Sequence, residues 1–278
     1  MRYAGSSTIE WPGMVSVYAV LGPDGRVTTT GAHQVGIDFS GHLGLVREIG
    51  GRAERYDAEP GAVYVTGPSP ITWLEVRDPT EALEIYPDRA LTDRLAGGTA
   101  EVRPSLAEPD GVVFAVASRL RRAHLDAGAL TDVEASTLAH LLVRHMLYRY
   151  GTGRGPRRRP AGHLRPGAVD VVAEYARAHL AGEITLDALA ATVNLSPYHF
   201  ARSFRATTGM TPHAFVTEHR LMVARDRLLR GDASVAGIAL SVGFCNISHF
   251  RRLFRRRYGL PPAGLRRAAV TGRSSMSP

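Results

Sequence analysis

The sequence predicts a multidomain α+β protein, with a β-rich N-terminal domain closed by helices and an all-helical C-terminal domain built from a duplicated pair of helices. Three observations predict this fold class. A length of 278 residues allows two domains, each with its own core. The spacing of apolar residues changes from strand-like to helical near residue 111. Near the C-terminus, one pattern recurs after 49 or 50 residues.

The first 150 residues contain the strand pattern. Short apolar or aromatic runs at 14–21, 61–66, 72–76 and 83–86 are separated by turn residues, which is typical of a β-sandwich or barrel. From about Gly111 the apolar residues follow a helical period, and Thr131 is placed to cap a second helix. We therefore expect strands closed by two helices over residues 1–150.

The remainder of the chain divides by composition. Residues 151–165 are rich in Gly, Pro and Arg with few apolar residues, which predicts a linker. Residues 166–270 form the predicted helical domain. We expect residues 271–278 to be a disordered tail.

The charge is basic, and its distribution is uneven. All 34 basic residues are arginines, and the net charge is +8. Residues 1–153 contain 14 arginines and 19 acidic residues, whereas residues 161–278 contain 16 arginines and 7 acidic residues. Guanidinium groups bind phosphate and guanine through paired donors, so an anionic partner of the C-terminal half is indicated.

Cysteine usage and hydropathy exclude other classes. A single cysteine cannot form a disulfide framework or a four-thiolate zinc site. No apolar segment at the start is typical of a signal peptide, and no run of about 20 apolar residues predicts a membrane span. We expect a cytoplasmic protein without a membrane partner.

The internal repeat carries most of the information. The first part of the repeat has an offset of 49 residues and relates Leu189, Ala190, Val193 and Asn194 to Ile238, Ala239, Val242 and Gly243. After one inserted residue the offset is 50, and it relates Ser196, Phe200, Arg202, Phe204, Arg205, Gly209 and Pro212 to Asn246, Phe250, Arg252, Phe254, Arg255, Gly259 and Pro262. Each copy predicts a helix, a tight turn and a second helix, at about 185–209 and 234–259. Asn194 and Gly243 suit the left-handed conformation that such a turn requires.

The second helix of each copy has a predicted cap and a predicted outer face. Ser196 and Asn246 are expected to cap these helices. The phenylalanines stand four residues apart and face the core, so the arginines between them face outward. Residues 213–230 predict one long helix that separates the two copies.

With these residues the sequence resembles the AraC/XylS family of bacterial transcription regulators over about 165–268. The resemblance is carried by Leu189-Ala190, residues 196–204, Gly209, Pro212, Arg220, Ala224, Leu228-Leu229, Ile238-Ala239, Gly243-Phe244, Ser248-His249-Phe250, Phe254, Gly259 and Pro262. It implies two helix-turn-helix units in successive major grooves of promoter DNA, a homodimer, and RNA polymerase as a partner. The N-terminal part resembles the family's cupin-like β-barrel, which senses small-molecule effectors.

The resemblance also implies which residues contact DNA. The base-contacting positions fall on Tyr198, Ala201 and Arg202 in the first copy, and on Ser248, His249 and Arg252 in the second. Arg202 and Arg252 are expected to bind guanine. Phosphate contacts are expected from Arg205, Arg251 and Arg255.

The N-terminal domain offers only general candidates for an effector site: His33, Arg47, Tyr64 and Trp73. We expect no cofactor and no metal, because His33 and His42 are isolated from any second histidine at ligand spacing. No catalytic residue is predicted, because the sequence contains neither a nucleophile elbow nor a phosphate loop. The protein is therefore expected not to be an enzyme.

Several alternatives stay open. The β-rich domain could be an enzyme with the helical repeat as a regulatory appendage, or it could only pair subunits through the helices of residues 113–150. The repeat itself could be an interaction module. An alkyl-accepting repair protein is nearly excluded, because Cys245 is the sole cysteine. Whether transcription is raised or lowered is not encoded in a recognisable motif.

Overall fold

The computed structural model of the protein describes residues 4–21, 28–49, 51–75, 80–125, 130–152, 162–231 and 233–267. The chain divides into an N-terminal unit, Arg2–Asp170 with Arg202–Met210, and a C-terminal unit, Val171–Ala201 with the chain from Thr211 onwards. Each unit is described by itself below. Residues 153–161 of the predicted linker and the predicted tail, residues 271–278, lie outside the described residues.

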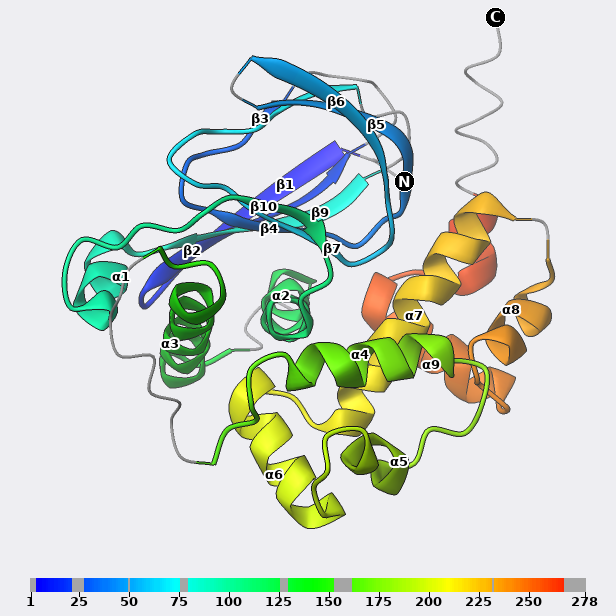
Figure 1. Ribbon diagram of the computed structural model, residues 1–278. Coiled ribbons are helices and arrows are strands. Elements are labelled where there is room, and N and C mark those ends of the chain that lie inside the picture. The colour runs from blue at the N-terminus through cyan, green and yellow to red at the C-terminus, as the bar shows by residue number, and fades with distance from the viewer. Residues whose placement is uncertain are drawn as a thin grey trace, which may run out of the picture. The chain divides into compact units, whose positions relative to one another are not determined.

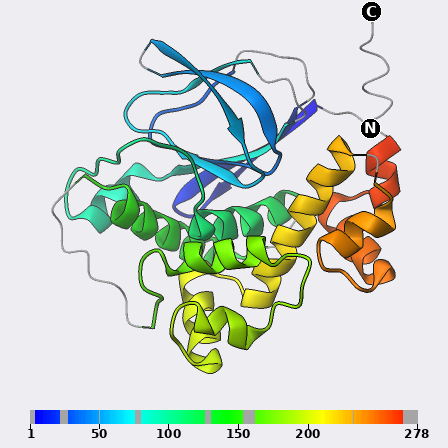
Figure 2. The same cartoon turned by 45° about the vertical axis from the view of Figure 1, so that its right-hand side comes forward.

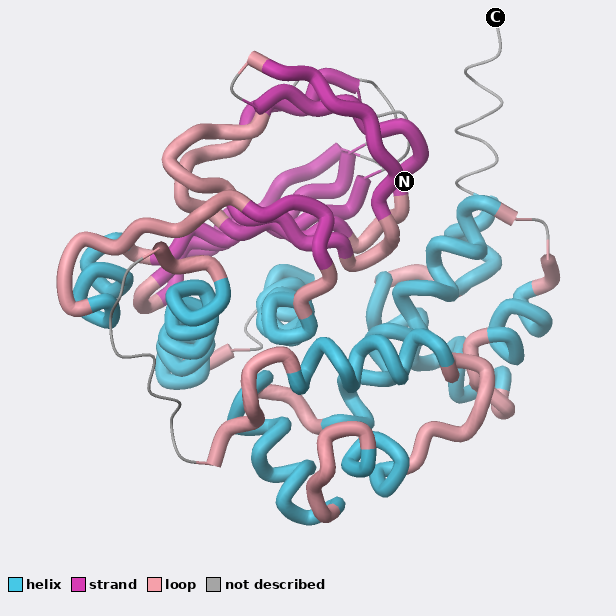
Figure 3. The backbone as a smooth tube through the Cα atoms, viewed as in Figure 1, coloured by secondary structure: helices cyan, strands magenta, loops and turns pink. Residues whose placement is uncertain are grey.

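Two antiparallel sheets form the strand region of the N-terminal unit (Figures 1 and 3). The first sheet has six strands, in the order β1 (Ala4–Trp11), β2 (Met14–Leu21), β9 (Thr80–Pro87), β4 (Val35–Asp38), β7 (Ala62–Val65) and β10 (Ser105–Glu108). The second sheet has four strands, in the order β3 (Thr28–Thr29), β8 (Thr72–Glu75), β5 (His42–Ile49) and β6 (Arg52–Ala58). Within the described residues, no ladder joins the two sheets. The predicted closed, cupin-like barrel is therefore not confirmed, because each sheet keeps two edge strands.

The six-stranded sheet buries one of its faces against helices. Along β4 and β9, Val35, Ile37, Leu83 and Ile85 are completely buried, while the residues between them point to the opposite face. Register pairs Val35 with Ile85 and Ile37 with Leu83, so these side chains form one continuous apolar surface. The main core of this unit therefore lies between the sheet and its helices.

Helices α2 (Gly111–Leu125) and α3 (Asp132–Arg149) cover that apolar face, and α1 (Arg89–Ala96) packs beside α3 (Figures 1 and 2). The two long helices begin where the sequence predicts them, and Thr131 forms a capping box with Glu134. Arg121 of α2 forms a buried ion pair with Glu81 of β9. Tyr18 donates a hydrogen bond of 3.0 Å to the same carboxylate, which compensates for the burial of its charge.

The helical domain consists of α4 (Ala168–Ala178), α5 (Leu186–Ala191), α6 (Pro197–Thr208), α7 (Pro212–Arg230), α8 (Val235–Ser241) and α9 (Ile247–Tyr258). The α5/α6 and α8/α9 pairs correspond to the two predicted copies. Helix α7 corresponds to the predicted long helix, and Thr211 caps it with Pro212 in its first turn. No described helix is long and apolar enough to cross a bilayer.

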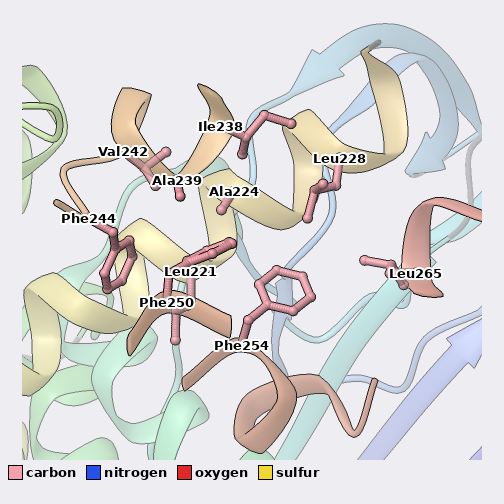
Figure 4. Close-up of a cluster of buried hydrophobic side chains, with 10 residues drawn as sticks. All are labelled: Leu221, Ala224, Leu228, Ile238, Ala239, Val242, Phe244, Phe250, Phe254 and Leu265. Carbon is pink, nitrogen blue, oxygen red and sulfur yellow. The ribbon is translucent and has the colours of Figure 1, made fainter. Parts of the chain in front are cut away.

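The second copy encloses its own apolar core between α7, α8 and α9 (Figure 4). Phe250 and Phe254 are completely buried, and their rings meet in a tilted arrangement at a centroid distance of 5.4 Å, as their spacing of four residues predicts. The small side chains of Ala224 and Ala239 lie between the helices and allow a close crossing. This core fixes the orientation of α9.

The turns between the paired helices have the predicted left-handed backbone. Asn194 has a φ of 55° and Gly243 a φ of 83°. An added Cβ at Gly243 would lie 2.2 Å from the carbonyl oxygen of Leu180, so this turn requires glycine for space as well as for conformation. The turn at Asn194 depends on conformation alone.

Candidate nucleic-acid interface

Helix α9 presents the more basic of the two candidate surfaces. Its twelve residues include five arginines and no acidic residue. Ser248, Arg251, Arg252 and Arg255 are exposed, while Phe250 and Phe254 anchor the opposite side. Such a helix can approach a phosphate backbone without a repulsive carboxylate.

The start of α9 is well ordered. The side chain of Asn246 accepts a hydrogen bond of 2.9 Å from the backbone N–H of His249, which confirms the predicted cap. His249 is half-buried, and its Nδ1 lies 2.9 Å from Nη2 of Arg252. The imidazole therefore holds the guanidinium of Arg252 on the outer face of the helix. Two of the predicted base-contacting residues of this copy thus form one connected group.

Helix α6 carries fewer charges. It contains two arginines, Arg202 and Arg205, both exposed, and no acidic residue. Tyr198 is 72% exposed, the most open ring at this helix start. Ala201 is half-buried and offers only a methyl group. Contacts from this helix to bases would therefore depend on Tyr198 and Arg202.

The predicted cap of α6 is not confirmed. Ser196 precedes the helix, but its hydroxyl oxygen lies 3.0 Å from Nδ1 of His199, and this is the contact described for its side chain. The backbone carbonyl of Ser196 still accepts the first helical hydrogen bond, from Phe200. A nearby imidazole thus competes with the backbone N–H groups that the hydroxyl was expected to bind.

Some arginines of the C-terminal unit serve the fold instead. Arg257, the last of the run that begins at Arg255, is buried, and its Nε lies 2.5 Å from Oε2 of Glu218 on α7. Tyr258 donates a hydrogen bond of 3.1 Å from its hydroxyl to the carbonyl oxygen of Leu221. These contacts fasten α9 to α7, so the exposed arginines stand on a fixed helix.

The candidate effector residues lie in the N-terminal unit. The ring of Tyr64 on β7 meets Trp73 of β8 edge to face at 5.4 Å, which brings the two sheets together. The guanidinium of Arg47 on β5 lies 4.1 Å from the ring centroid of Tyr56, whose ring is 6.5 Å from Trp73. Arg47, Tyr64 and Trp73 therefore belong to one cluster between the sheets. No described side-chain contact connects His33 to this cluster.

Sequence reasoning missed other members of this inter-sheet cluster. Glu84 accepts hydrogen bonds from the hydroxyls of Tyr64, at 3.2 Å, and Tyr86, at 2.7 Å. Burial, followed by the charge of Glu84, raises the pKa of Tyr64 well above its usual value, so this phenol remains a donor. The alternation of Leu83, Glu84, Ile85 and Tyr86 could have revealed the polar face of β9.

Two buried groups facing this space lack partners among the described residues. They are Nε and Nη1 of Arg47 and the side-chain nitrogen of Gln34. Both side chains are more than nine-tenths buried. Buried donors without acceptors are unfavourable in a folded protein.

The helical domain is similar in sequence to known proteins. Residues 189–268 match a family described as a helix-turn-helix domain. The regulatory protein PocR of Salmonella typhimurium is 37% identical over 92 residues, which cover 33% of this chain and 30% of PocR. The transcriptional activator RhaS of Escherichia coli is 39% identical over 88 residues, which cover 32% of each protein.

A third relative has two activities in its name. The bifunctional transcriptional activator/DNA repair enzyme AdaA of Bacillus subtilis is 32% identical over 98 residues, covering 35% of this chain and 46% of AdaA. The chain thus spans less than half the length of each of these relatives. Residues 189–268 of this chain thus contain a helix-turn-helix domain, as the residues of the repeat predict, and this domain is similar to those of the transcription regulators named above.

Proposed function

We propose that the protein is a DNA-binding transcription regulator that places α6 and α9 in two successive major grooves of promoter DNA. The observation that carries this proposal is the duplicated pair of helices, each with exposed arginines and no carboxylate on its second helix. Major-groove binding by the second helix of such a unit is the usual docking geometry.

Within this proposal the exposed side chains take separate roles. Arg202 and Arg252 bind guanine through two donors, with Tyr198, Ala201, Ser248 and His249 completing the base contacts. Arg205, Arg251 and Arg255 bind phosphates and set the position of each helix. Because α9 carries more arginines, the second copy supplies more of the electrostatic attraction.

Binding of the full chain to promoter DNA at several salt concentrations tests this function. We expect log K to fall linearly with log salt, and replacement of Arg251 or Arg255 by Gln to reduce the slope by about 1 each. Arg52→Gln, an exposed arginine of the N-terminal unit, is the matched control and should leave the slope unchanged. Binding that does not depend on salt would contradict the proposal.

The N-terminal unit, in this proposal, binds a small-molecule effector between its two sheets. The Nε and Nη1 donors of Arg47 support this assignment, because they lack a partner among the described residues and the guanidinium lies over the ring of Tyr56, while Nη2 donates to Glu54. Compounds that raise the melting temperature of the full chain should lose this effect in Arg47→Met but keep it in Arg52→Met. If no compound stabilises the chain, a unit that only pairs subunits becomes the better interpretation.

A homodimer and contact with RNA polymerase complete the proposal and rest on the family alone. A repair activity such as the one in AdaA's name is not part of it. Cys245 is exposed but is the sole cysteine of the chain, whereas repair by alkyl transfer in this family requires further thiolates for zinc. Sedimentation of the full chain would test the dimer.

A further inference from the structure

Two helix-turn-helix units can select a fixed half-site spacing only if they are rigidly joined. Each added base pair moves a half-site by roughly 3.4 Å along the helix axis and turns it by about 35° around that axis. A loose connection would follow such changes at little cost. The groups that connect the two copies therefore decide how strictly spacing is selected.

Arg220, near the middle of α7, contacts the loop that leads into the first copy and the turn of the second copy. Its Nη2 donates a hydrogen bond of 2.7 Å to the carbonyl oxygen of Gly182, in the loop before α5. Its Nη1 donates one of 3.1 Å to the carbonyl oxygen of Gly243, in the turn before α9. One guanidinium thus bridges the backbone of the loop that leads into the first copy and the backbone of the second copy.

The bridge lies where the loop after α4 meets the turn of the second copy. A Cβ at Gly243 would stand 2.2 Å from the carbonyl oxygen of Leu180 and 2.7 Å from the guanidinium carbon of Arg220. The loop after α4 and the turn before α9 are therefore in direct contact, with the Arg220 head against both. The side chain of Arg220 is half-buried, which strengthens hydrogen bonds between a cation and carbonyl oxygens.

The geometry of the guanidinium suits this task. Its planar fork has five donors in fixed directions, so two carbonyl oxygens bound at once are held at a defined separation and angle. An ammonium group is a point charge on a flexible stem and would not impose that angle. The bridge therefore depends on arginine and not on positive charge alone.

From these contacts we infer that Arg220 is a positioning residue that sets the spacing between the two DNA half-sites. It does so by locking the turn of the second copy to the loop between α4 and α5, which leads into the first copy. The inference rests on the proposed function, since spacing has a meaning only if both copies bind DNA. Arg220 itself does not contact the bases.

A neighbouring arginine on the same helix provides a matched control. Arg227 donates from Nη1 to the carbonyl oxygen of Ser241, at 3.1 Å, and to its hydroxyl, at 2.6 Å. These bonds connect α7 to the end of α8, within the second copy. Loss of Arg227 thus removes similar hydrogen bonds without touching the bridge between copies.

The test compares the full-length wild type with Arg220→Met and Arg227→Met. DNA bound from a random pool identifies the two half-sites, and affinities are then measured for sites whose half-sites are moved apart or together by one base pair. We expect the wild type to discriminate against the altered spacings. In Arg220→Met this discrimination should fall by roughly tenfold, which corresponds to about 1.4 kcal/mol. Arg227→Met should keep it.

Arg220→Lys keeps the proposal falsifiable if Arg220→Met is too unstable at the assay temperature. The lysine variant should discriminate less than the wild type, although it retains the charge. Wild-type discrimination in either Arg220 variant would overturn the inference, as would equal losses in Arg227→Met. A wild type that shows no salt-dependent DNA binding would instead refute the proposed function, so the two failures are distinguishable.

Discussion

The two helix-turn-helix copies share a pattern but differ in how their parts are held. In the second copy, Asn246 caps α9, His249 holds Arg252, and Arg257 is paired with Glu218 in the interior. In the first copy, α6 has half-buried Ala201 at the equivalent position of Arg251, and Ser196 contacts an imidazole instead of the backbone. The two copies therefore share their buried apolar positions more closely than their exposed polar residues.

The largest difference between the copies is expected at their turns. Gly243→Ala should reduce the free energy of unfolding by more than about 3 kcal/mol, because the new Cβ meets a backbone oxygen and the backbone is left-handed. Asn194→Ala meets only the conformational penalty and should cost about 1 kcal/mol. Urea unfolding followed by helical circular dichroism measures both. Equal losses would show that the turns are equivalent after all.

Acid should reveal whether the copies unfold together through α7. His219 on α7 is buried, and burial, followed by the charge of Arg177, lowers its pKa to about 3. The unfolded state, with a pKa of about 6.5, binds the proton more readily. Stability due to His219 is therefore complete above about pH 6.5 and is lost at about 1.4 kcal/mol per pH unit as the pH falls towards 3.

Hydrogen exchange at Leu189 of α5 and Ile238 of α8, corrected for intrinsic rates, would measure this loss in both copies. Equal acid-induced losses at the two amides would indicate one cooperative unit. His219→Gln should flatten the dependence while leaving the contribution of the carboxylates. If the wild type and this variant have the same pH slope, the buried histidine is not the cause.

The two copies should differ less in base selectivity, and the second copy should be the more selective. Arg252→Ala should lower discrimination at one base position by about 1–3 kcal/mol, and Arg202→Ala by less, because no described hydrogen bond holds the guanidinium of Arg202. Competition binding with single-base substitutions measures both. His249→Ala should weaken the effect of Arg252 without abolishing DNA binding. A larger loss of base discrimination in Arg202→Ala than in Arg252→Ala would show that the first copy is the more selective.

The helix caps should give the smallest difference. Asn246→Ala removes a side-chain acceptor for the N–H of His249 and should cost about 1 kcal/mol. Ser196→Ala should cost no more than about 0.5 kcal/mol, the low end for such positions, since its hydroxyl contacts the ring of His199. Thermal unfolding of the two variants side by side distinguishes them. A greater loss of stability in Ser196→Ala than in Asn246→Ala would indicate that Ser196 caps α6 as predicted.

Much of the helical domain could be predicted from sequence because its signals are local. The spacing of Phe250 and Phe254, the turn residue Gly243 and the cap Asn246 each act within a few residues. The strand region was predicted less completely. The run at 14–21 corresponds to β2, but β1, β5 and β6 were not expected, because their polar and charged residues obscure the alternation.

The candidate sites divide in the same way. The outward arginines of α6 and α9 follow from helical periodicity. The inter-sheet cluster joins Arg47, Tyr64 and Trp73 from three strands, and only pairing across the sheets brings Tyr56 and Glu84 beside them. Sequence supplied three of these residues but could not show that they meet, nor that His33 stands apart.

Signals between neighbouring residues predict where the helices of the repeat begin, where they turn and which faces are basic, because periodicity, caps and left-handed turns are short-range properties. The tertiary structure decided that Arg257 is buried against Glu218 and that Arg220 joins Gly182 to Gly243. Arg220 and Arg257 are both arginines on helices, and the sequence pattern alone does not distinguish their roles. What separates them is which neighbours the packing of distant segments brings within hydrogen-bonding distance.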